Sequence, residues 1–425
     1  MKKINVWYFL LSFYFYFPFI LKDIREINYI IIYLIPLIYI IFNAKFVLSF
    51  FRTLMKSHIK LSFISYFIVF CLSLIVPALY GTYDFSYNNV FLSIIRTLIK
   101  TLFLLIVFIK IHKNNDFVLF IKYFIYSCSL YVAFSLLMII IPEFKSFWAG
   151  IIYDSALNIQ LSMQDKYITR YGLVGFSNFR ETFMCSLAAI FNVYIIVKNI
   201  NTHTKNGTMI WTLLILGLGT SFYGRIGLVV YLISVGLLIF YLFFHKPRYF
   251  LLIVLSIAIL LTVLISLKER NEMVNIWFNW SFDLFLNYFE TGKLETGSSN
   301  TVFEKMIFMP DAMTFLFGDG YYSNPNGSGY YMSTDVGFMR PLLFYGFIPT
   351  MIAYGITYFL LFSILKVSLK RIDVAGIILS LLLFIQIVLF EIKGEMFYIM
   401  FPLLLPFAYM YFLENTSDYA KSNKT

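Results

Sequence analysis

The chain is built from apolar blocks of roughly 20 residues, the length at which a helix spans the hydrocarbon core of a bilayer. Apolar residues make up 60% of its 425 residues and charged residues only 13%, whereas charged residues make up about 25% of a soluble domain. A soluble core cannot bury so much apolar surface, and exposing it to water would cause aggregation. The pattern therefore predicts an all-α polytopic membrane protein. It excludes a soluble enzyme, a secreted disulfide-rich scaffold and a disordered chain.

About 12 blocks are candidates for transmembrane helices in a single membrane domain, 1–425. They cover residues 4–21, 27–43, 61–80, 90–109, 117–141, 177–197, 208–223, 226–244, 249–267, 337–365, 374–390 and 396–413. The first block follows a basic N-terminus but lacks a small-residue cleavage site, which indicates an uncleaved helix rather than a signal peptide. Two connections are long, 142–176 and 268–336, and the others are short.

Basic residues divide unevenly between the two ends of these blocks. With the N-terminus inside, the inside segments hold about half of the 33 basic residues, which is the positive-inside pattern. The short outside turns hold only Lys22, Arg25, Arg225 and Lys393. This places both termini in the cytoplasm and both long loops at the outer face of a bacterial inner (plasma) membrane. The net charge of +11 is therefore a topology signal and not a nucleic-acid footprint.

Histidine and cysteine chemistry is not expected at the outer face. All four histidines fall in inside segments: His58, His112, His203 and His245. The outer loops therefore offer no histidine for acid–base work or for binding a metal, and we expect neither a metal nor another cofactor. The three cysteines lie inside apolar blocks without a CxxC motif, and we interpret them as buried hydrophobic residues.

Four arginines stand near the outer ends of the predicted helices: Arg170, Arg180, Arg225 and Arg340. A guanidinium group stays charged and offers a fork of donors that suits phosphate or pyrophosphate. We therefore expect at least two of the four to bind an anion and all four to converge on one outward cavity. Snorkelling, or a structural ion pair between Arg180 and a carboxylate, is the alternative.

Two further features could contribute to a site. Arg96 and Lys100 lie one turn apart on one face of a predicted helix, where they could form a cationic wall for an anionic lipid headgroup or pair with an acid on a neighbouring helix. The stretch 273–289 interrupts aromatic residues with polar ones, which predicts an amphipathic helix at the membrane interface within the large outer loop. Its rings could also stack on sugars.

The layout and order of these motifs resemble those of the bacterial O-antigen polymerases, the Wzy family, which are related to the O-antigen ligases. The local resemblance lies in Arg170 before a glycine-rich helix entry, in TSFYGRIGLVVYL, and in an outer loop ending FGDGYY…TDVGFMRPLLFYGFI. The resemblance implies a membrane glycosyltransferase that polymerises repeat units carried on undecaprenyl pyrophosphate into O-antigen or capsular polysaccharide. It also implies membrane lipid, a flippase and a chain-length regulator as partners.

Residue types in the outer segments suit this chemistry. Arginines can bind the pyrophosphate leaving group, and a carboxylate can act as the base for the acceptor hydroxyl. Asp335 is the first candidate for that base, followed by Glu181 and Asp319. Lys305 stands near a position where relatives often have an arginine, and it is a further candidate for substrate binding.

Two other functions compete with polymerisation. Ligases of this group carry a histidine in the large outer loop, whereas the comparable stretch here reads Ser333-Thr334-Asp335. A flippase or other transporter would also be polytopic, but transporters usually show two related halves, and the sequence shows no internal repeat.

The charge pattern makes a prediction about topology. Alkaline phosphatase fused after residue 300 should be active, because the enzyme folds outside the cytoplasm and 268–336 is predicted to lie there. A fusion after Lys113 should be inactive. An inactive fusion at residue 300 in a well-expressed protein would contradict the predicted orientation.

Overall fold

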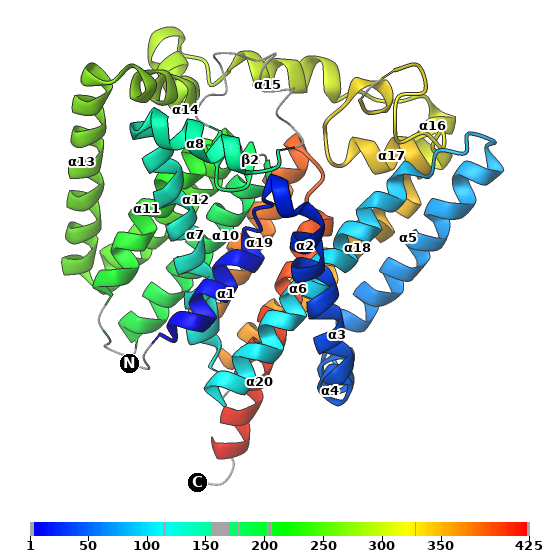
Figure 1. The fold of residues 1–425 in the computed structure, drawn as a ribbon, viewed down its shortest axis with the longest axis horizontal. Coiled ribbons are helices and arrows are strands. Elements are labelled where there is room, and N and C mark those ends of the chain that lie inside the picture. Colours follow the sequence, from blue (N-terminus) through cyan, green and yellow to red (C-terminus); the bar gives the residue numbers. More distant parts are fainter. Residues whose placement is uncertain are drawn as a thin grey trace. The chain divides into compact units, whose positions relative to one another are not determined.

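The computed structural model describes residues 4–113, 116–154, 170–176, 179–201, 204, 206–327 and 329–422. Helices dominate these residues (Figure 1). Within the described ranges the only strands are β1 (Tyr171–Gly172) and β2 (Gly175–Phe176), a short antiparallel hairpin in which Gly172 lies opposite Gly175. The predicted all-α class is confirmed.

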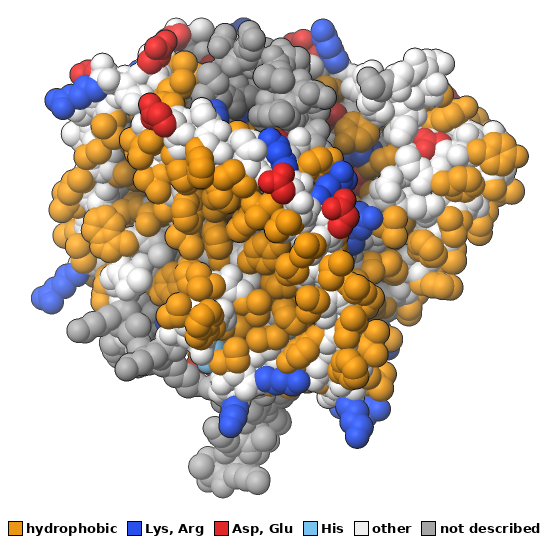
Figure 2. Space-filling model, viewed as in Figure 1, with side chains coloured by type: hydrophobic (Ala, Val, Ile, Leu, Met, Phe, Trp, Pro, Cys, Tyr) orange, Lys and Arg blue, Asp and Glu red, His pale blue; other side chains and the backbone are white. Residues whose placement is uncertain are grey.

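Ten helical segments of the described chain are long and apolar enough to cross a membrane. They are Lys22–Phe42, Ile59–Leu79 (α5), Phe85–His112, Phe117–Ile140 (α7), Phe179–Ile200, Arg225–His245 (α12), Pro247–Arg270 (α13), Phe347–Arg371 (α18), Val374–Lys393 (α19) and Phe397–Asn415. Apolar side chains cover much of the surface in view (Figure 2). The protein is therefore a multi-pass membrane protein.

Several of these segments combine helices of different kinds. The segment Lys22–Phe42 contains η1 (Lys22–Ile24), α2 (Arg25–Tyr29), η2 (Ile30–Leu34) and α3 (Ile35–Phe42), and Phe85–His112 contains η3 (Phe85–Tyr87) and α6 (Asn88–His112). The segment Phe179–Ile200 is part of α10 (Phe179–Asn201), and Phe397–Asn415 is part of α20 (Phe397–Ser422).

Each predicted block contains a helix, but two of the helices are short. These are α1 (Val6–Tyr16), with 11 residues, and α11 (Gly207–Tyr223), with 17. At 1.5 Å per residue both are shorter than a hydrocarbon core of about 30 Å, so the count of twelve spans stays a prediction.

The chain divides into two compact units. Unit 1 comprises Met1–Ile35 and Val118–Leu294, and unit 2 comprises Pro36–Phe117 and Glu295–Thr425. The membrane domain expected from the sequence thus has two parts, each with its own buried helices.

Unit 1 is built around α10. The span within this helix is 89% buried, and α10 packs against both α11 and α12. Asn192 on α10 donates a buried hydrogen bond of 2.8 Å to the hydroxyl of Thr212 on α11. At its periphery, α13 packs against α12 and against α14 (Glu272–Thr291), and only 11% of the α13 span is buried. The exposed apolar surface of α13 is suited to contact with lipid.

Unit 2 is built around α18, which packs against α5, α19 and α20, while α6 packs along α20. Prolines interrupt the backbone hydrogen bonding of α20, because Pro406 has no N–H to donate to the carbonyl of Pro402 four residues earlier. The hydroxyl of Thr101 on α6 donates to that carbonyl at 3.1 Å. A side chain of a neighbouring helix therefore satisfies a polar group that would otherwise be unpaired in an apolar environment.

The long connections contain secondary structure of their own. The first holds α8 (Pro142–Ile151) and the β1–β2 hairpin, and the second holds α14, α15 (Gly297–Thr301), η4 (Val302–Met306), α16 (Ala312–Phe317) and η5 (Tyr331–Ser333). The helix predicted at 273–289 is confirmed as α14, and its place at a membrane interface stays a prediction. In addition, α4 (Ala44–Met55) occupies a stretch that the sequence prediction leaves outside the membrane-spanning blocks.

One predicted helix boundary is wrong. The block 337–365 is not one helix but two, α17 (Met339–Tyr345) and α18, separated by Gly346. Gly346 has a φ of +85°, and a Cβ atom there would overlap the carbonyl group of Leu316 at the end of α16. The break lets α16 approach the backbone between α17 and α18, which hydrophobicity alone does not reveal.

The geometry at Gly346 predicts a strong effect of substitution. Gly346→Ala should lower the free energy of unfolding by at least about 2 kcal/mol, because it adds steric overlap to an unfavourable φ. Gly292→Ala is the matched control: its φ is +74°, but no atom lies within 4 Å of the new Cβ, so the loss should be about 1 kcal/mol. Unfolding in mixed detergent micelles measures both, and equal losses would contradict the role of the contact with Leu316.

Candidate functional site

The site in unit 1 begins at the turn between α11 and α12. Thr182 on α10 donates its hydroxyl to the carbonyl oxygens of Thr220 at 3.1 Å and Gly224 at 3.0 Å. A Cβ atom on Gly227 would overlap the Thr182 side chain, so the glycine allows the first turn of α12 to pack closely on α10. These contacts fix the position of Arg225, the first residue of α12.

Two guanidinium groups lie near one indole ring. Arg170 and Arg225 have their Cζ atoms 4.8 Å and 5.1 Å from the centroid of Trp280 on α14. The Nε of Arg225 donates to the backbone oxygen of Trp280 at 2.9 Å, and its Nη1 lies 3.1 Å from a carboxylate oxygen of Asp283. The Arg225–Asp283 pair is partly exposed, at 24% and 33% of the two side chains. Two guanidinium groups beside one aromatic ring offer the type of donor that binds an anionic ligand.

The other two predicted residues of unit 1 lie in the first turn of α10. The Nη2 of Arg180 donates to the backbone oxygen of Tyr16 at 3.1 Å, at the end of α1. Glu181 is 5% exposed, so its carboxylate is buried. The structure thus joins Arg170 and Arg225 at Trp280, whereas Arg180 contacts the end of α1.

A second site, in unit 2, surrounds Arg340 on α17. Its guanidinium group lies between two tyrosine rings, with Cζ 4.4 Å from the centroid of Tyr322 and 3.6 Å from that of Tyr330. Its Nη1 lies 3.5 Å from the Glu395 carboxylate, and its Nη2 donates to the hydroxyl of Tyr322. The Arg340 side chain is only 9% exposed, so these contacts take place largely out of water.

Glu395 is the centre of this second site. Its carboxylate accepts hydrogen bonds from the hydroxyls of Tyr322 at 2.8 Å and Tyr87 at 3.0 Å, and the hydroxyl of Tyr345 lies 2.9 Å from that of Tyr87. Burial raises the pKa of Glu395, while the charge of Arg340 and the hydrogen bond from Tyr87 oppose that shift. Burial likewise raises the pKa of the Tyr330 phenol.

Asp84 holds the loop that carries Tyr322. Its carboxylate accepts hydrogen bonds from the backbone N–H groups of Tyr322 at 2.8 Å and Ser323 at 2.7 Å. The hydroxyl of Thr82 donates to the carbonyl of Gly320 at 2.7 Å. The connection between α5 and α6 therefore anchors the FGDGYY turn and positions its second tyrosine beside Arg340.

Sequence reasoning missed Glu391 and Glu395 at the end of α19. Glu391 accepts the backbone N–H groups of Met396 at 2.6 Å and Phe397 at 2.8 Å, so it caps the N-terminus of α20, and the Tyr354 hydroxyl donates to it at 2.6 Å. The sequence does hold a signal for them, because two glutamates lie in a short connection between two apolar blocks. Burying an acidic side chain there without a partner costs free energy, so partners are expected.

The position predicted for Asp335 needs correction. The sequence places it beside a helix that starts at Gly337, but α17 begins at Met339 with Phe338 at its N-cap position, so Asp335 is not the cap. The carboxylate that pairs with Arg340 is that of Glu395. Asp335 is exposed, and its charge acts on the neighbouring Tyr330 phenol. Its role as a base stays a prediction.

The remaining predicted residues of unit 2 are not among the contacts of Arg340 given above. Lys305 is exposed in η4, and Asp319 accepts hydrogen bonds from Thr314 at 2.8 Å and Tyr331 at 3.1 Å. On α6, Arg96 is exposed, whereas Lys100 is buried and only 6% exposed. The convergence of all four arginines on one cavity stays a prediction, because Arg340 belongs to unit 2 and the others to unit 1.

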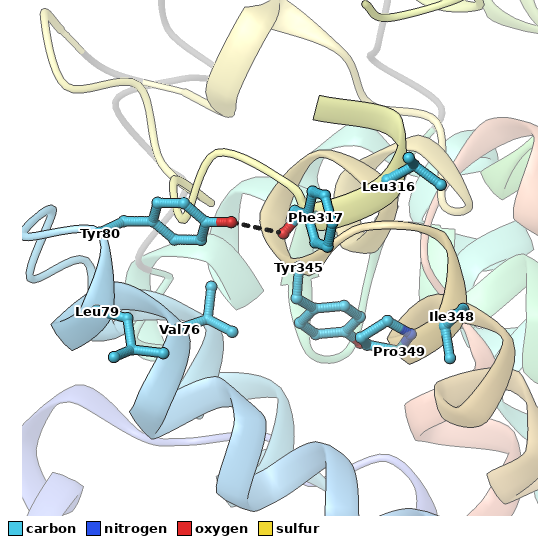
Figure 3. A pocket seen from close by; sticks show the side chains of 8 residues that line it. All are labelled: Val76, Leu79, Tyr80, Leu316, Phe317, Tyr345, Ile348 and Pro349. Carbon is cyan, nitrogen blue, oxygen red and sulfur yellow. Dashed lines mark hydrogen bonds between the residues drawn. The ribbon is translucent and has the colours of Figure 1, made fainter. Parts of the chain in front are cut away.

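An apolar pocket of about 460 Å³ lies beside the second site (Figure 3). Its lining contains no charged residue: Val76, Leu79, Tyr80, Leu316, Phe317, Tyr345, Ile348 and Pro349. The Tyr80 hydroxyl donates to the carbonyl of Phe317 at 3.3 Å, and Tyr345 also belongs to the tyrosine cluster around Glu395. The pocket can accept an apolar group. Among the described residues, no group of three or more His, Cys, Asp or Glu side chains is arranged to hold a metal ion.

No protein-family model, no curated protein and no solved structure matches the chain significantly.

The two ion pairs predict different losses of stability. Glu395→Ala should lower the free energy of unfolding by about 3 kcal/mol, because it leaves the buried Arg340 without its carboxylate. Asp283→Ala removes the corresponding acid from the partly exposed pair with Arg225 and should cost less than about 1 kcal/mol. Unfolding in mixed micelles compares the two variants, and a loss for Asp283→Ala as large as that for Glu395→Ala would refute the distinction.

Proposed function

We propose that this protein is a membrane glycosyltransferase that polymerises glycan repeat units carried on undecaprenyl pyrophosphate. In this proposal twelve helices cross the bacterial inner membrane, and loops 142–176 and 268–336 lie at its outer face. The observation that carries the proposal is the placement of Arg170 and Arg225 against Trp280, since it supplies two guanidinium groups for an anionic leaving group. The motif resemblance supplies the reaction class.

The reaction joins an acceptor hydroxyl to the anomeric carbon of the donor glycan. The new C–O bond forms as the bond from that carbon to the pyrophosphate oxygen breaks, and the lipid pyrophosphate leaves with the bonding electrons. Guanidinium groups stabilise the negative charge that develops on the leaving group. A carboxylate takes the proton of the hydroxyl.

The partly exposed Arg225 suits such a role better than Arg340. Arg225 is 24% exposed, so an anionic ligand can reach its guanidinium group. Arg340 is enclosed by two tyrosines and a glutamate and suits a structural or positioning role in the loop that carries Asp335. The proposal therefore ranks Arg225 above Arg340 for contact with pyrophosphate.

A deletion strain tests the proposed function. Loss of the gene should leave surface lipopolysaccharide with a single repeat unit on its core, because repeat units are still made and attached but not polymerised. Complementation with Arg225→Lys should yield at least about tenfold less long-chain polymer than wild type, since a point ammonium cannot reproduce the fork of a guanidinium group.

Arg248→Lys is the matched control, because Arg248 is exposed at the opposite end of the predicted helices from Arg225. It should restore wild-type polymer, and immunoblotting should show equal abundance of both variants in the membrane. A deletion strain without any repeat unit would instead indicate a ligase or a flippase. Full polymer from Arg225→Lys would refute the role of its guanidinium fork.

A further inference from the structure

The helix α4 of unit 2 presents three different faces. Phe50 and Leu54 are fully buried, and the ring of Phe50 lies 4.9 Å from that of Tyr409 on α20. These contacts fix one face of α4 against the helices of unit 2. Because a helix turns every 3.6 residues, the opposite face carries other residues at a regular spacing.

The face of α4 opposite Phe50 and Leu54 is basic. Lys45, Arg52 and Lys56 follow one another at seven and four residues, which places them on one side of the helix, and all three are exposed. Within the described residues none of the three forms a salt bridge with a carboxylate. The sequence contains no acidic residue anywhere from 27 to 83, so the basic face has no local counter-charge.

The third face of α4 is apolar and exposed. Leu48 and Met55 lie beside the basic stripe and are 65% and 45% exposed, and Phe42, just before the helix, is 84% exposed. A basic stripe alone would suit any soluble anion. Because an apolar strip runs along the basic stripe, the matching surface offers both anionic groups and hydrocarbon. The boundary between lipid headgroups and acyl chains is such a surface.

Neighbouring helices of unit 2 extend the positive charge. Lys60 is the second residue of α5, and Lys366 and Lys370 lie near the end of α18; all three are exposed. The Nζ of Lys366 lies 2.7 Å from Nε2 of His58, at the start of α5. Figure 2 shows Lys and Arg side chains at the end of the molecule where α4 lies in Figure 1.

Two carboxylates near this end of unit 2 form hydrogen bonds with other elements. Asp373 accepts a hydrogen bond of 3.1 Å from the hydroxyl of Tyr411, and Glu414 accepts one of 3.1 Å from the backbone N–H of Phe117. These contacts hold Asp373 against α20 and Glu414 against the start of α7.

We propose that α4 is a binding surface for anionic phospholipid. Lys45, Arg52 and Lys56 bind the headgroup phosphates, while Leu48 and Met55 insert among the acyl chains. Each basic side chain near such a surface adds attraction, so the surface selects anionic over zwitterionic lipid. This inference concerns the end of unit 2 away from Arg340 and does not depend on the proposed glycosyltransferase activity.

Native mass spectrometry of the detergent-purified full chain tests the proposal. The probes are phosphatidylglycerol and phosphatidylcholine with identical acyl chains. Wild type should retain more phosphatidylglycerol than phosphatidylcholine. In the triple variant Lys45→Gln/Arg52→Gln/Lys56→Gln, the ratio of retained phosphatidylglycerol to retained phosphatidylcholine should fall by about tenfold or more. Retention of phosphatidylcholine should not change. Leu48→Ser/Met55→Ser keeps every charge and should weaken retention of both lipids.

The matched control removes the same charge elsewhere, through Arg248→Gln/Arg270→Gln/Lys293→Gln, all at exposed residues. This control should keep the wild-type preference, and monodisperse gel filtration should show that every variant is folded. An unchanged preference in the α4 triple variant would overturn the proposal, as would an equal loss in the control. Displacement of phosphatidylglycerol by millimolar inorganic phosphate would instead identify a site for a soluble anion and would also overturn it.

Discussion

The structure depends on one constraint, which is that backbone N–H and C=O groups in an apolar environment must find partners within the protein. Helices satisfy it locally, which is why a chain with 60% apolar residues folds almost entirely into helices. Where a helix cannot satisfy it, a neighbour does. The hydroxyl of Thr101 pairs with the Pro402 carbonyl that Pro406 leaves free, and the carboxylate of Glu391 pairs with N–H groups at the start of α20.

The same constraint separates the two arginine sites. Arg340 and Glu395 are almost completely buried, and three tyrosine hydroxyls form a hydrogen-bonded cluster around them. Such a cluster holds the loops 80–87 and 318–335 of unit 2 in a fixed arrangement, because each buried polar group needs all of its partners. The Arg225–Asp283 pair beside Trp280 is partly exposed, at 24% and 33% of the two side chains, so a ligand can approach it from solvent.

Charge also distinguishes the two ends of unit 2. One end combines Arg340 with Glu391, Glu395, Asp84 and Asp319, and these carboxylates are held by the guanidinium group or by hydrogen bonds from N–H and O–H groups. The other end carries an excess of exposed lysine and arginine along α4, α5 and α18. In the proposed orientation the end with Arg340 lies at the outer face of the membrane, and the basic end faces the cytoplasmic leaflet, whose anionic lipids complement it.

The sequence by itself determined the class of the protein and the approximate positions of most of its long helices, because long apolar blocks have few alternatives to the helix in a membrane. It also indicated arginines at the helix ends, since a guanidinium group is conspicuous beside an apolar block. Only the tertiary structure decided what these arginines contact: Trp280 lies 55 residues from Arg225, and Tyr87 lies 308 residues from Glu395. Hydrophobicity fixes where a helix lies along the chain but not which of its faces meets which neighbour. The break at Gly346 and the partners of Arg340 therefore follow from packing, which a single sequence does not encode locally.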